Sequence, residues 1–299
     1  MKKTLLLLCI SLLLFACNHQ TQEPEDIFFK GKDSYQREVV LQHEPLRVVS
    51  FSQAVTEAIF LLHAEEKLVG ISQFCDYPPE TEKIPKVGDL ININVENVLK
   101  QHPDLIIIGS IVSDKTVKQF EKAGIPVYCL KEESRIDDLP KLIRTTGTLL
   151  NRAAAADSLA HIYEKKIADY RAQSSQSQKS VYYVVGFGAT GDYTAAGNTF
   201  INDIITLAGG RNIGESLTTW SVSREYLFQQ DPDYIFIREE DFNTFCQTSP
   251  YDQLSAVQNG HAYPIRSSSI DNLCPRNFEV IDEMAGKLKV ESRELKGES

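Results

Sequence analysis

The pattern of apolar and polar positions occurs twice along the chain. Residues 94–108 read NVENVLKQHPDLIII and residues 223–237 read SREYLFQQDPDYIFI, with six of the fifteen positions identical. In each copy, apolar residues at helical spacing precede a Pro-Asp pair and a continuous apolar run. Proline ends a helix, and an apolar run without alternation is typical of a strand buried on both faces. Each copy therefore predicts a short helix followed by a strand of a parallel sheet.

The distance between the two copies predicts two similar lobes. The copies lie 129 residues apart, which is about the length of a small domain and far longer than a solenoid repeat. Around them, short apolar runs alternate with helical patterns, the signature of βα units in a mostly parallel sheet. The predicted fold is α/β, with similar Rossmann-like lobes at residues 46–150 and 180–288 and a long helix within residues 151–179. A cleft between two such lobes is where ligands usually bind.

The same patterns place individual elements. A hairpin is expected within residues 27–45, and the charged residues 289–299 are expected to form a loosely ordered tail. Strands are expected at residues 46–52, 69–72, 105–108, 126–130, 181–185, 234–237 and 262–265. Longer helices are expected at residues 56–63, 115–123, 137–150, 152–173, 200–208 and 276–288.

The first residues have the pattern of an export signal. Two lysines precede a nearly continuous apolar stretch at residues 5–15, which is too short to span a membrane comfortably. The stretch ends in Leu-Phe-Ala-Cys17, which resembles a bacterial lipobox, so residues 1–16 are predicted to be a lipoprotein signal peptide and Cys17 to carry the lipid. The alternative is an ordinary signal peptide with an incidental cysteine. We expect a lipid-anchored protein of the cell envelope that faces the periplasm, with residues 17–45 as tether and hairpin.

Composition and charge exclude several classes of function. The chain has a formal net charge of −10 and no basic run, so it is a poor candidate for binding nucleic acid. Its six histidines are scattered without the spacing of metal ligands, and neither a GxSxG nor an HExxH motif occurs. We therefore expect no metal site, no cofactor and no enzymatic activity, and a chain that acts as a monomer.

Four cysteines remain beyond the predicted signal and the lipidated Cys17. A disulfide between Cys246 and Cys274 is one prediction, since an exported protein meets an oxidising compartment. Buried, unpaired thiols are the alternative, because sequence alone does not determine the pairing of four cysteines.

Residues 186–191 match the GxGxxG pattern directly after a predicted strand. In a dinucleotide site this loop opens a helix whose N-terminus holds the pyrophosphate. Here residues 192–198 prolong the loop, and no strand ending in an acidic residue follows about 20 residues later. We therefore interpret the segment as a loop of the cleft and not as a nucleotide site.

The order of motifs along residues 46–288 resembles a known family. RVVSFS is followed by a GIS-to-DYPP loop, VGD, the first repeat copy and AGIPVY; then come TFINDIITLAGGRNI, Trp220, the second copy and a Pro-Arg helix. This order is similar to that of the substrate-binding proteins of bacterial ABC importers for vitamin B12, ferric siderophores and haem. The loop that begins at Asp76 and the segment from Trp220 to Glu225 resemble the vitamin B12 members most. Those members have a tryptophan where this chain has Leu90.

The resemblance implies a helical-backbone periplasmic binding protein fold, in which a single rigid helix, here residues 152–173, joins the lobes and the ligand binds between them. It also implies that one glutamate of each lobe, Glu96 and Glu225, docks on arginines of a permease dimer that carries ATPase subunits. Such carboxylate–arginine pairs are charge-assisted and often bidentate. The alternative is that both carboxylates only stabilise the first turns of their helices.

The expected ligand is cobalamin-like, and a ferric siderophore or haem is the alternative. By resemblance, Phe74 and Trp220 contact the flat ring, and Tyr77, Tyr193 and Arg211 are further candidates. An anionic siderophore calls for arginines in the cleft, and haem calls for an axial tyrosine or histidine. The residues available for these roles include Arg211, Arg238, Arg266, Arg276 and His261.

Overall fold

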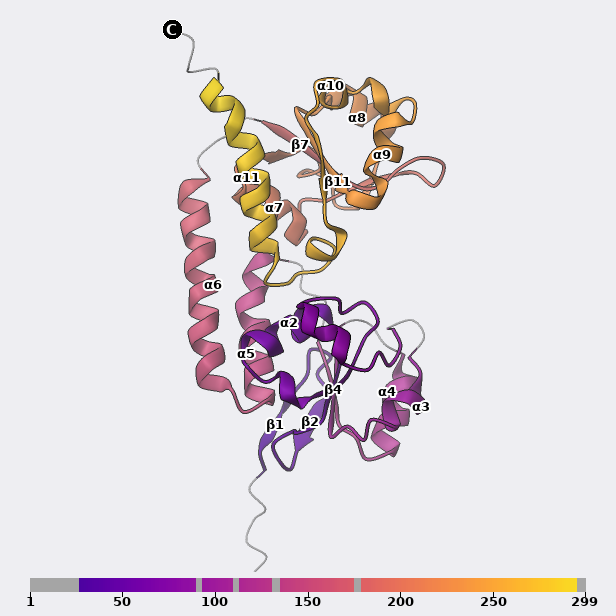
Figure 1. Ribbon diagram of the computed structural model, residues 1–299, viewed down its shortest axis with the longest axis vertical. Helices are drawn as coiled ribbons and strands as arrows, with labels where there is room; N and C mark the ends of the chain where they lie inside the picture. The colour runs from indigo at the N-terminus through magenta and orange to yellow at the C-terminus, as the bar shows by residue number, and fades with distance from the viewer. Residues whose placement is uncertain (1–26, 90–92, 110–112, 131–134, 175–178, 295–299) are drawn as a thin grey trace, which may run out of the picture.

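The computed structural model describes residues 27–89, 93–109, 113–130, 135–174 and 179–294. It has two α/β lobes, one above the other in Figure 1, and a long helix, α6, that runs along both. The predicted signal peptide, Cys17 and Leu90 lie outside the described residues. Within the described ranges, no helix combines the length and apolarity needed to cross a membrane.

The first lobe is built on a parallel sheet, which follows an antiparallel hairpin of β1 (Phe29–Lys32) and β2 (Glu38–Leu41). The strands of the sheet lie in the spatial order β4 (Leu68–Ile71), β3 (Val48–Phe51), β5 (Leu105–Ile108) and β6 (Val127–Cys129). They are connected or followed by the helices α2 (Gln53–Leu61), α3 (Val95–Leu99), α4 (Asp114–Lys122) and α5 (Leu139–Leu149), with 3₁₀ turns at Glu65–Lys67, Pro79–Lys83 and Ile136–Asp138.

The second lobe has a mixed sheet whose central strands are parallel. Its strands lie in the order β10 (Ser221–Val222), β8 (Asp192–Thr194), β7 (Ser180–Gly186), β11 (Tyr234–Arg238) and β12 (Ala262–Ile265), and β9 (Arg211–Asn212) also pairs with β7. Its helices are α7 (Phe200–Leu207), α8 (Arg224–Gln230), α9 (Glu239–Gln247), α10 (Ser255–Gln258) and α11 (Asn277–Glu294), with 3₁₀ turns at Tyr251–Gln253 and Ser267–Ser269.

The sequence repeat forms equivalent structures in the two lobes. The Asn94 side chain accepts a hydrogen bond at the start of α3, and Ser223 does the same at the start of α8. After each helix, equivalent residues, His102 and Asp231, take left-handed φ values of 48° and 36° before the proline. Helix, turn and strand therefore follow the same path in both copies, as the repeat predicts.

The repeated aspartate has a structural role in each lobe. Asp104 accepts hydrogen bonds from the backbone N–H groups of Leu46 and Arg47, just before β3, at 2.8 and 2.9 Å. Asp233 accepts them from the N–H and the hydroxyl of Ser180, at the start of β7, at 2.7 and 2.8 Å. In both lobes this carboxylate ties the strand of the repeat to the neighbouring strand.

The predicted connecting helix is α6 (Ala153–Gln173), which is about 30 Å long at 1.5 Å per residue. It packs along α5 in the first lobe, and its Tyr163 and Tyr170 rings contact Phe278 of α11 in the second, with centroid distances of 5.1 and 5.9 Å. Because α6 is uninterrupted and contacts both lobes, it fits the rigid connection expected from the sequence.

Two predictions about element boundaries need correction. α11 continues to Glu294, so residues 289–294 are helical and do not belong to a loose tail. These residues include lysine, arginine and glutamate, which favour helix, and no glycine or proline that would end it. The helix expected at residues 56–63 begins at Gln53, because the Ser52 hydroxyl caps it by accepting a hydrogen bond from Val55.

The predicted disulfide is wrong. Cys246 and Cys274 are both free, as are Cys75 and Cys129. Cys274 is fully buried in the main core, which includes α7 and α11, whereas Cys246 packs on the core under α8 and α9. Alternate residues of β7 face these two cores, so the sheet of the second lobe separates the two sulfurs.

Candidate ligand-binding site

A cavity of about 590 Å³ lies between the two lobes. Its first-lobe wall comes from the carboxyl ends of β3, β4, β5 and β6, and its second-lobe wall includes the segment that follows β12. In open α/β sheets, ligands bind beyond the carboxyl ends of the strands. The cavity therefore lies where the fold places ligands, and its volume is typical of small-molecule sites.

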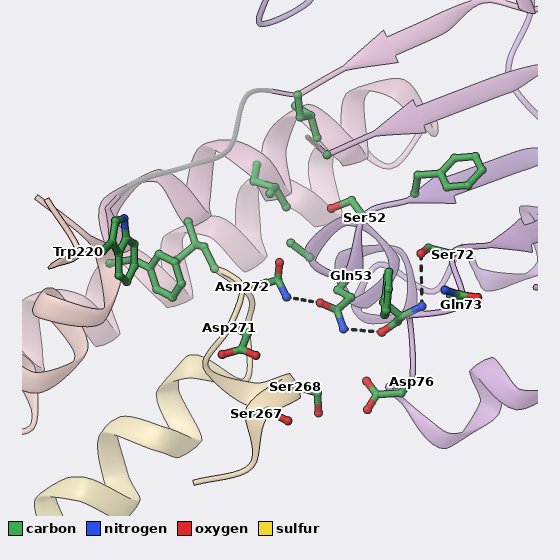
Figure 2. Close-up of a pocket in the computed structure, with 18 residues that line it drawn as sticks. Ser52, Gln53, Ser72, Gln73, Asp76, Trp220, Ser267, Ser268, Asp271 and Asn272 are labelled. Atoms are coloured by element: carbon green, nitrogen blue, oxygen red, sulfur yellow. Dashed lines mark hydrogen bonds between the residues drawn. The ribbon is translucent and has the colours of Figure 1, made fainter. Parts of the chain in front are cut away.

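Of the four aromatic side chains that line the cavity, two are largely exposed, and they come from opposite lobes. Phe74 follows β4 and Trp220 precedes β10. Their exposed fractions are 53% and 41%, which is high for rings of this size. Figure 2 shows Trp220 on one side of the cavity and Ser72 and Gln73 on the other. Exposed apolar rings in a concave site are typical of a surface that a ligand covers.

Hydroxyl and amide side chains form most of the polar lining. Gln53 is central: its amide donates to the Phe74 carbonyl and accepts from Asn272, a contact that joins the lobes (Figure 2). Gln73 donates to Asp89 at 2.8 Å. The serines of the lining are Ser52, Ser72, Ser267 and Ser268.

Two carboxylates, Asp76 and Asp271, line the cavity, and arginines of the second lobe neutralise both. Asp76 lies 3.6 Å from Arg266 and 3.7 Å from Arg276. Asp271 accepts a hydrogen bond of 3.0 Å from Arg238. Burial raises the pKa of the Asp271 carboxyl, and Arg238 offsets part of that rise.

Among the described residues that line the cavity, none is an arginine, lysine, histidine or tyrosine. Arg276 is 3% exposed and donates to Glu57 across the lobes at 2.8 Å, so it is committed to a buried ion pair. Arg238 and Arg266 are engaged by the carboxylates of the lining. Three of the four arginines that the sequence offered for an anionic ligand, Arg238, Arg266 and Arg276, thus belong to the protein's own ion pairs.

Two further candidates lie away from the cavity. Arg211 pairs with Ser180 at the beginning of β7, whereas the cavity lies at the carboxyl ends of the sheets. The carbonyl of His261 accepts from Ile235 near the beginning of β11, and its ring stacks on Tyr234. The structure therefore places both Arg211, a candidate ligand contact, and His261, a candidate axial ligand for haem, outside the lining of this cavity.

The two candidate tyrosines do not line the cavity either. Tyr77 packs beneath Arg276, whose guanidinium lies 4.4 Å from the centre of the ring. Tyr193 donates from its hydroxyl to the Thr190 carbonyl, within the turn that joins β7 and β8. Tyr77 stabilises the interface between the lobes, and Tyr193 stabilises a local turn.

The GxGxxG segment forms that same turn. β7 ends at Gly186 and β8 begins at Asp192, antiparallel to it, so no helix begins at Gly188. The Gly188 N–H donates to the Tyr251 hydroxyl at 3.0 Å and is thus engaged within the lobe. The segment therefore lacks the helix N-terminus of a dinucleotide site, and, contrary to the expectation of a loop in the cleft, none of these residues lines the cavity.

The two glutamates of the repeat are exposed in the first turns of α3 and α8. Figure 1 shows α3 and α8 on the side of their lobes away from α6. Neither Glu96 nor Glu225 lines the cavity. The structure therefore leaves both carboxylates exposed on the surface and outside the lining of the cavity.

Several lining residues were not singled out from the sequence, among them Gln53, Gln73, Asp271 and Asn272. A usable signal existed for the first-lobe residues: Gln53 and Gln73 follow β3 and β4 within two residues of the strand ends. In a parallel sheet such positions face the ligand edge. Asp271 and Asn272 lie in an irregular segment before α11 and carry no comparable pattern.

The chain belongs to the periplasmic binding protein family, whose profile matches residues 48–268. It is 30% identical over 286 residues to the cobalamin-binding protein of Halobacterium salinarum, an alignment that covers 90% of this chain and 74% of that protein. It is 26% identical to the ABC transporter substrate-binding lipoprotein YvrC of Bacillus subtilis, which is uncharacterised, with 85% of this chain and 83% of that protein covered.

The fold is also similar to a solved haem receptor. The periplasmic haem-binding protein HutB of Vibrio cholerae superposes with a TM-score of 0.74 at 22% identity, covering 81% of this chain and 98% of that one. At this identity the likeness concerns the fold alone. Together, the family and the fold define a periplasmic binding protein, and the similar proteins include receptors for cobalamin and haem.

Proposed function

We propose that this protein captures a cobalamin-like ligand between its lobes and delivers it to an ABC importer. The observation that carries the proposal is the chemistry of the cavity: exposed rings from opposite lobes, surrounded by hydroxyl and amide groups, with no cation among the described lining residues. A corrin ring offers flat apolar faces, and its rim carries neutral amides that hydroxyl and amide side chains match. The cobalamin-binding relative supports the same ligand.

Haem or a ferric siderophore is the alternative, and the similar fold of a haem receptor is compatible with it. Haem calls for an axial ligand, and anionic propionates or siderophores call for arginine or lysine. In the described part of the lining these groups are absent, because the nearby arginines are paired with Glu57, Asp76 and Asp271. The cavity therefore favours a neutral, amide-rich ligand over an anionic one.

To deliver its ligand, the protein must bind the membrane-embedded permease of the importer. We propose export by residues 1–16, lipid attachment at Cys17, and docking through Glu96 and Glu225 on arginines of a permease dimer with its ATPase subunits. The exposure of both carboxylates on equivalent helices supports docking on a partner with two similar subunits. The lipoprotein relative supports both the lipid anchor and the ABC importer.

Isothermal titration calorimetry tests the ligand. The purified chain, freed of ligand, is titrated in parallel with cyanocobalamin, haemin and ferrichrome. We expect cyanocobalamin to bind with a nanomolar dissociation constant and the other two to bind at least about 100-fold more weakly. Absence of heat with cyanocobalamin, confirmed by equilibrium dialysis with labelled ligand, would reject the corrinoid and leave the family assignment intact.

A further inference from the structure

The two exposed glutamates of the repeat differ in their surroundings. The carboxylate of Glu96 forms an ion pair with Lys100, one helical turn later on α3, with a distance of 2.8 Å from Oε1 to Nζ. The position equivalent to Lys100 in the second lobe is Gln229, which has no charge. Across the described ranges, no cation is paired with Glu225.

The arginine next to Glu225 does not replace this lysine. The guanidinium of Arg224 is bound within the lobe, where it donates to the buried Asp192 at 3.2 Å and to the Tyr251 hydroxyl at 2.9 Å. Arg224 therefore anchors α8 to the lobe and leaves the Glu225 carboxylate open. Glu96 is equally exposed, but one of its oxygens already accepts a bond from an ammonium group.

This difference affects how each carboxylate receives a guanidinium. Both oxygens of a carboxylate take part in a bidentate pair with arginine. At Glu96, an arriving arginine must displace Lys100 or share the carboxylate with it, and the ammonium repels the guanidinium at close range. The hydrogen bond from Lys100 lowers the pKa of Glu96, so Glu96 is ionised at neutral pH and the difference lies in competition for the carboxylate.

We propose that Lys100 weakens docking by the first lobe, so that Glu225 of the second lobe makes the stronger contact with the permease. This inference rests on the proposed docking function and adds an asymmetry to it. The inference implies that the permease surface presents one guanidinium to each lobe. The contact with α8 is the tighter of the two.

The test exchanges the two positions. Lys100→Gln gives the first lobe the residue of the second, and Gln229→Lys gives the second lobe that of the first. Binding of each ligand-loaded variant to the cognate permease–ATPase complex in lipid nanodiscs is measured by biolayer interferometry. We expect Lys100→Gln to tighten binding about two- to fivefold and Gln229→Lys to weaken it by a similar factor.

A matched control separates the local effect from a change in net charge. Lys165 forms an equivalent i,i+4 ion pair with Asp169, at 2.6 Å, on α6, away from α3 and α8. Lys165→Gln removes the same charge and should leave binding unchanged. If Lys100→Gln weakens binding, or matches the effect of Lys165→Gln, the inference is overturned.

A charge-reversal variant distinguishes this inference from the proposed function. Glu96→Lys combined with Glu225→Lys should abolish binding to the permease complex and leave cyanocobalamin affinity intact. If the double variant still binds the complex like the wild type, docking through these glutamates is wrong altogether. If it fails to bind while Lys100→Gln and Gln229→Lys both behave like the wild type, only the asymmetry is wrong.

Discussion

At the scale of single residues, the structure separates the aromatic candidates into two groups. Two of them line the cavity, where a ligand can contact them, and two stabilise the fold. Trp220 and Phe74 are large, partly exposed and directed into a concave surface. Tyr77 is covered by a guanidinium, and Tyr193 is bound to its own turn. All four carry the aromatic ring expected of a contact with a flat ligand, and only their environments distinguish them.

Trp220→Ala should weaken cyanocobalamin binding. A buried aromatic anchor typically contributes about 1–4 kcal/mol, which corresponds to roughly a five- to 1,000-fold rise in the dissociation constant. Titration calorimetry on the folded variant measures the change. Arg211→Ala is the matched control, because this exposed side chain lies at the opposite edge of its sheet and should leave affinity unaltered. Equal affinity of Trp220→Ala and the wild type would remove Trp220 from the site.

At the scale of elements, α5 and α6 pack extensively against each other and anchor the connection between the lobes. Gly147 of α5 permits the approach, because a β-carbon there would lie 2.2 Å from that of Ala156. Arg144 of α5 donates to Asp157 at 2.8 Å and to Glu164 at 2.5 Å, both on α6. A small residue and a charge cluster thus hold the start of the connecting helix.

This cluster should make stability depend on pH. Hydrogen bonds from Arg144 lower the pKa values of Asp157 and Glu164 in the folded state. Their contribution is therefore fully present above the ordinary carboxyl pKa of about 4 and is lost as pH falls through the lowered values. Arg144→Gln should reduce the urea midpoint at pH 7, and its difference from the wild type should shrink between about pH 5 and pH 3.

Lys165→Gln again serves as control, because its ion pair lies within α6 and does not reach α5. The pH-dependent difference seen for Arg144→Gln should not appear in this variant. A constant difference between Arg144→Gln and the wild type from pH 7 to pH 3 would show that Arg144 acts through packing and not through the two carboxylates.

At the scale of the whole molecule, a buried ion pair joins the lobes beside the cavity. Glu57 of α2 and Arg276, just before α11, are each 3% exposed. Burial raises the pKa of Glu57, and the bond from Arg276 offsets part of that rise. The second oxygen of Glu57 has no hydrogen-bond partner among the described residues. The pair therefore compensates a large desolvation cost only while both partners are present.

Removing one partner should destabilise the protein strongly. Glu57→Leu leaves the buried Arg276 charge with only the more distant and partly exposed Asp76, at 3.7 Å, as a carboxylate partner, which costs about 3–5 kcal/mol in the free energy of unfolding. The double variant Glu57→Leu/Arg276→Met should return close to wild-type stability, because both charges are then absent. Urea unfolding of the single and double variants measures the coupling. Additive losses in the double variant would contradict a role as an interlobe ion pair.

The sequence by itself determined the elements and their repetition. Capping residues, helical spacing and apolar runs are properties of neighbouring residues, so Asn94, Ser223 and the buried strands were recognisable without the fold. The boundary of α11 was missed because charged residues suit a helix and a loose tail equally well. The spacing of the repeat predicted the two-lobe arrangement, and the family resemblance identified Phe74 and Trp220 as candidates.

Only the tertiary structure decided which polar side chains share the cavity and which charges are paired. Gln53 contacts Asn272, and Glu57 contacts Arg276, each across 219 residues of chain. No local pattern encodes contacts over such separations, so the sequence suggested Arg211 and His261, which lie away from the cavity, and missed Gln53 and Asp271, which line it. The separation of Cys246 from Cys274 was equally hidden, since it depends on which face of a sheet each helix covers. The interactions that form a helix or a strand occur between residues a few positions apart, so the sequence shows them directly. A binding site is assembled from strand ends that meet only after folding.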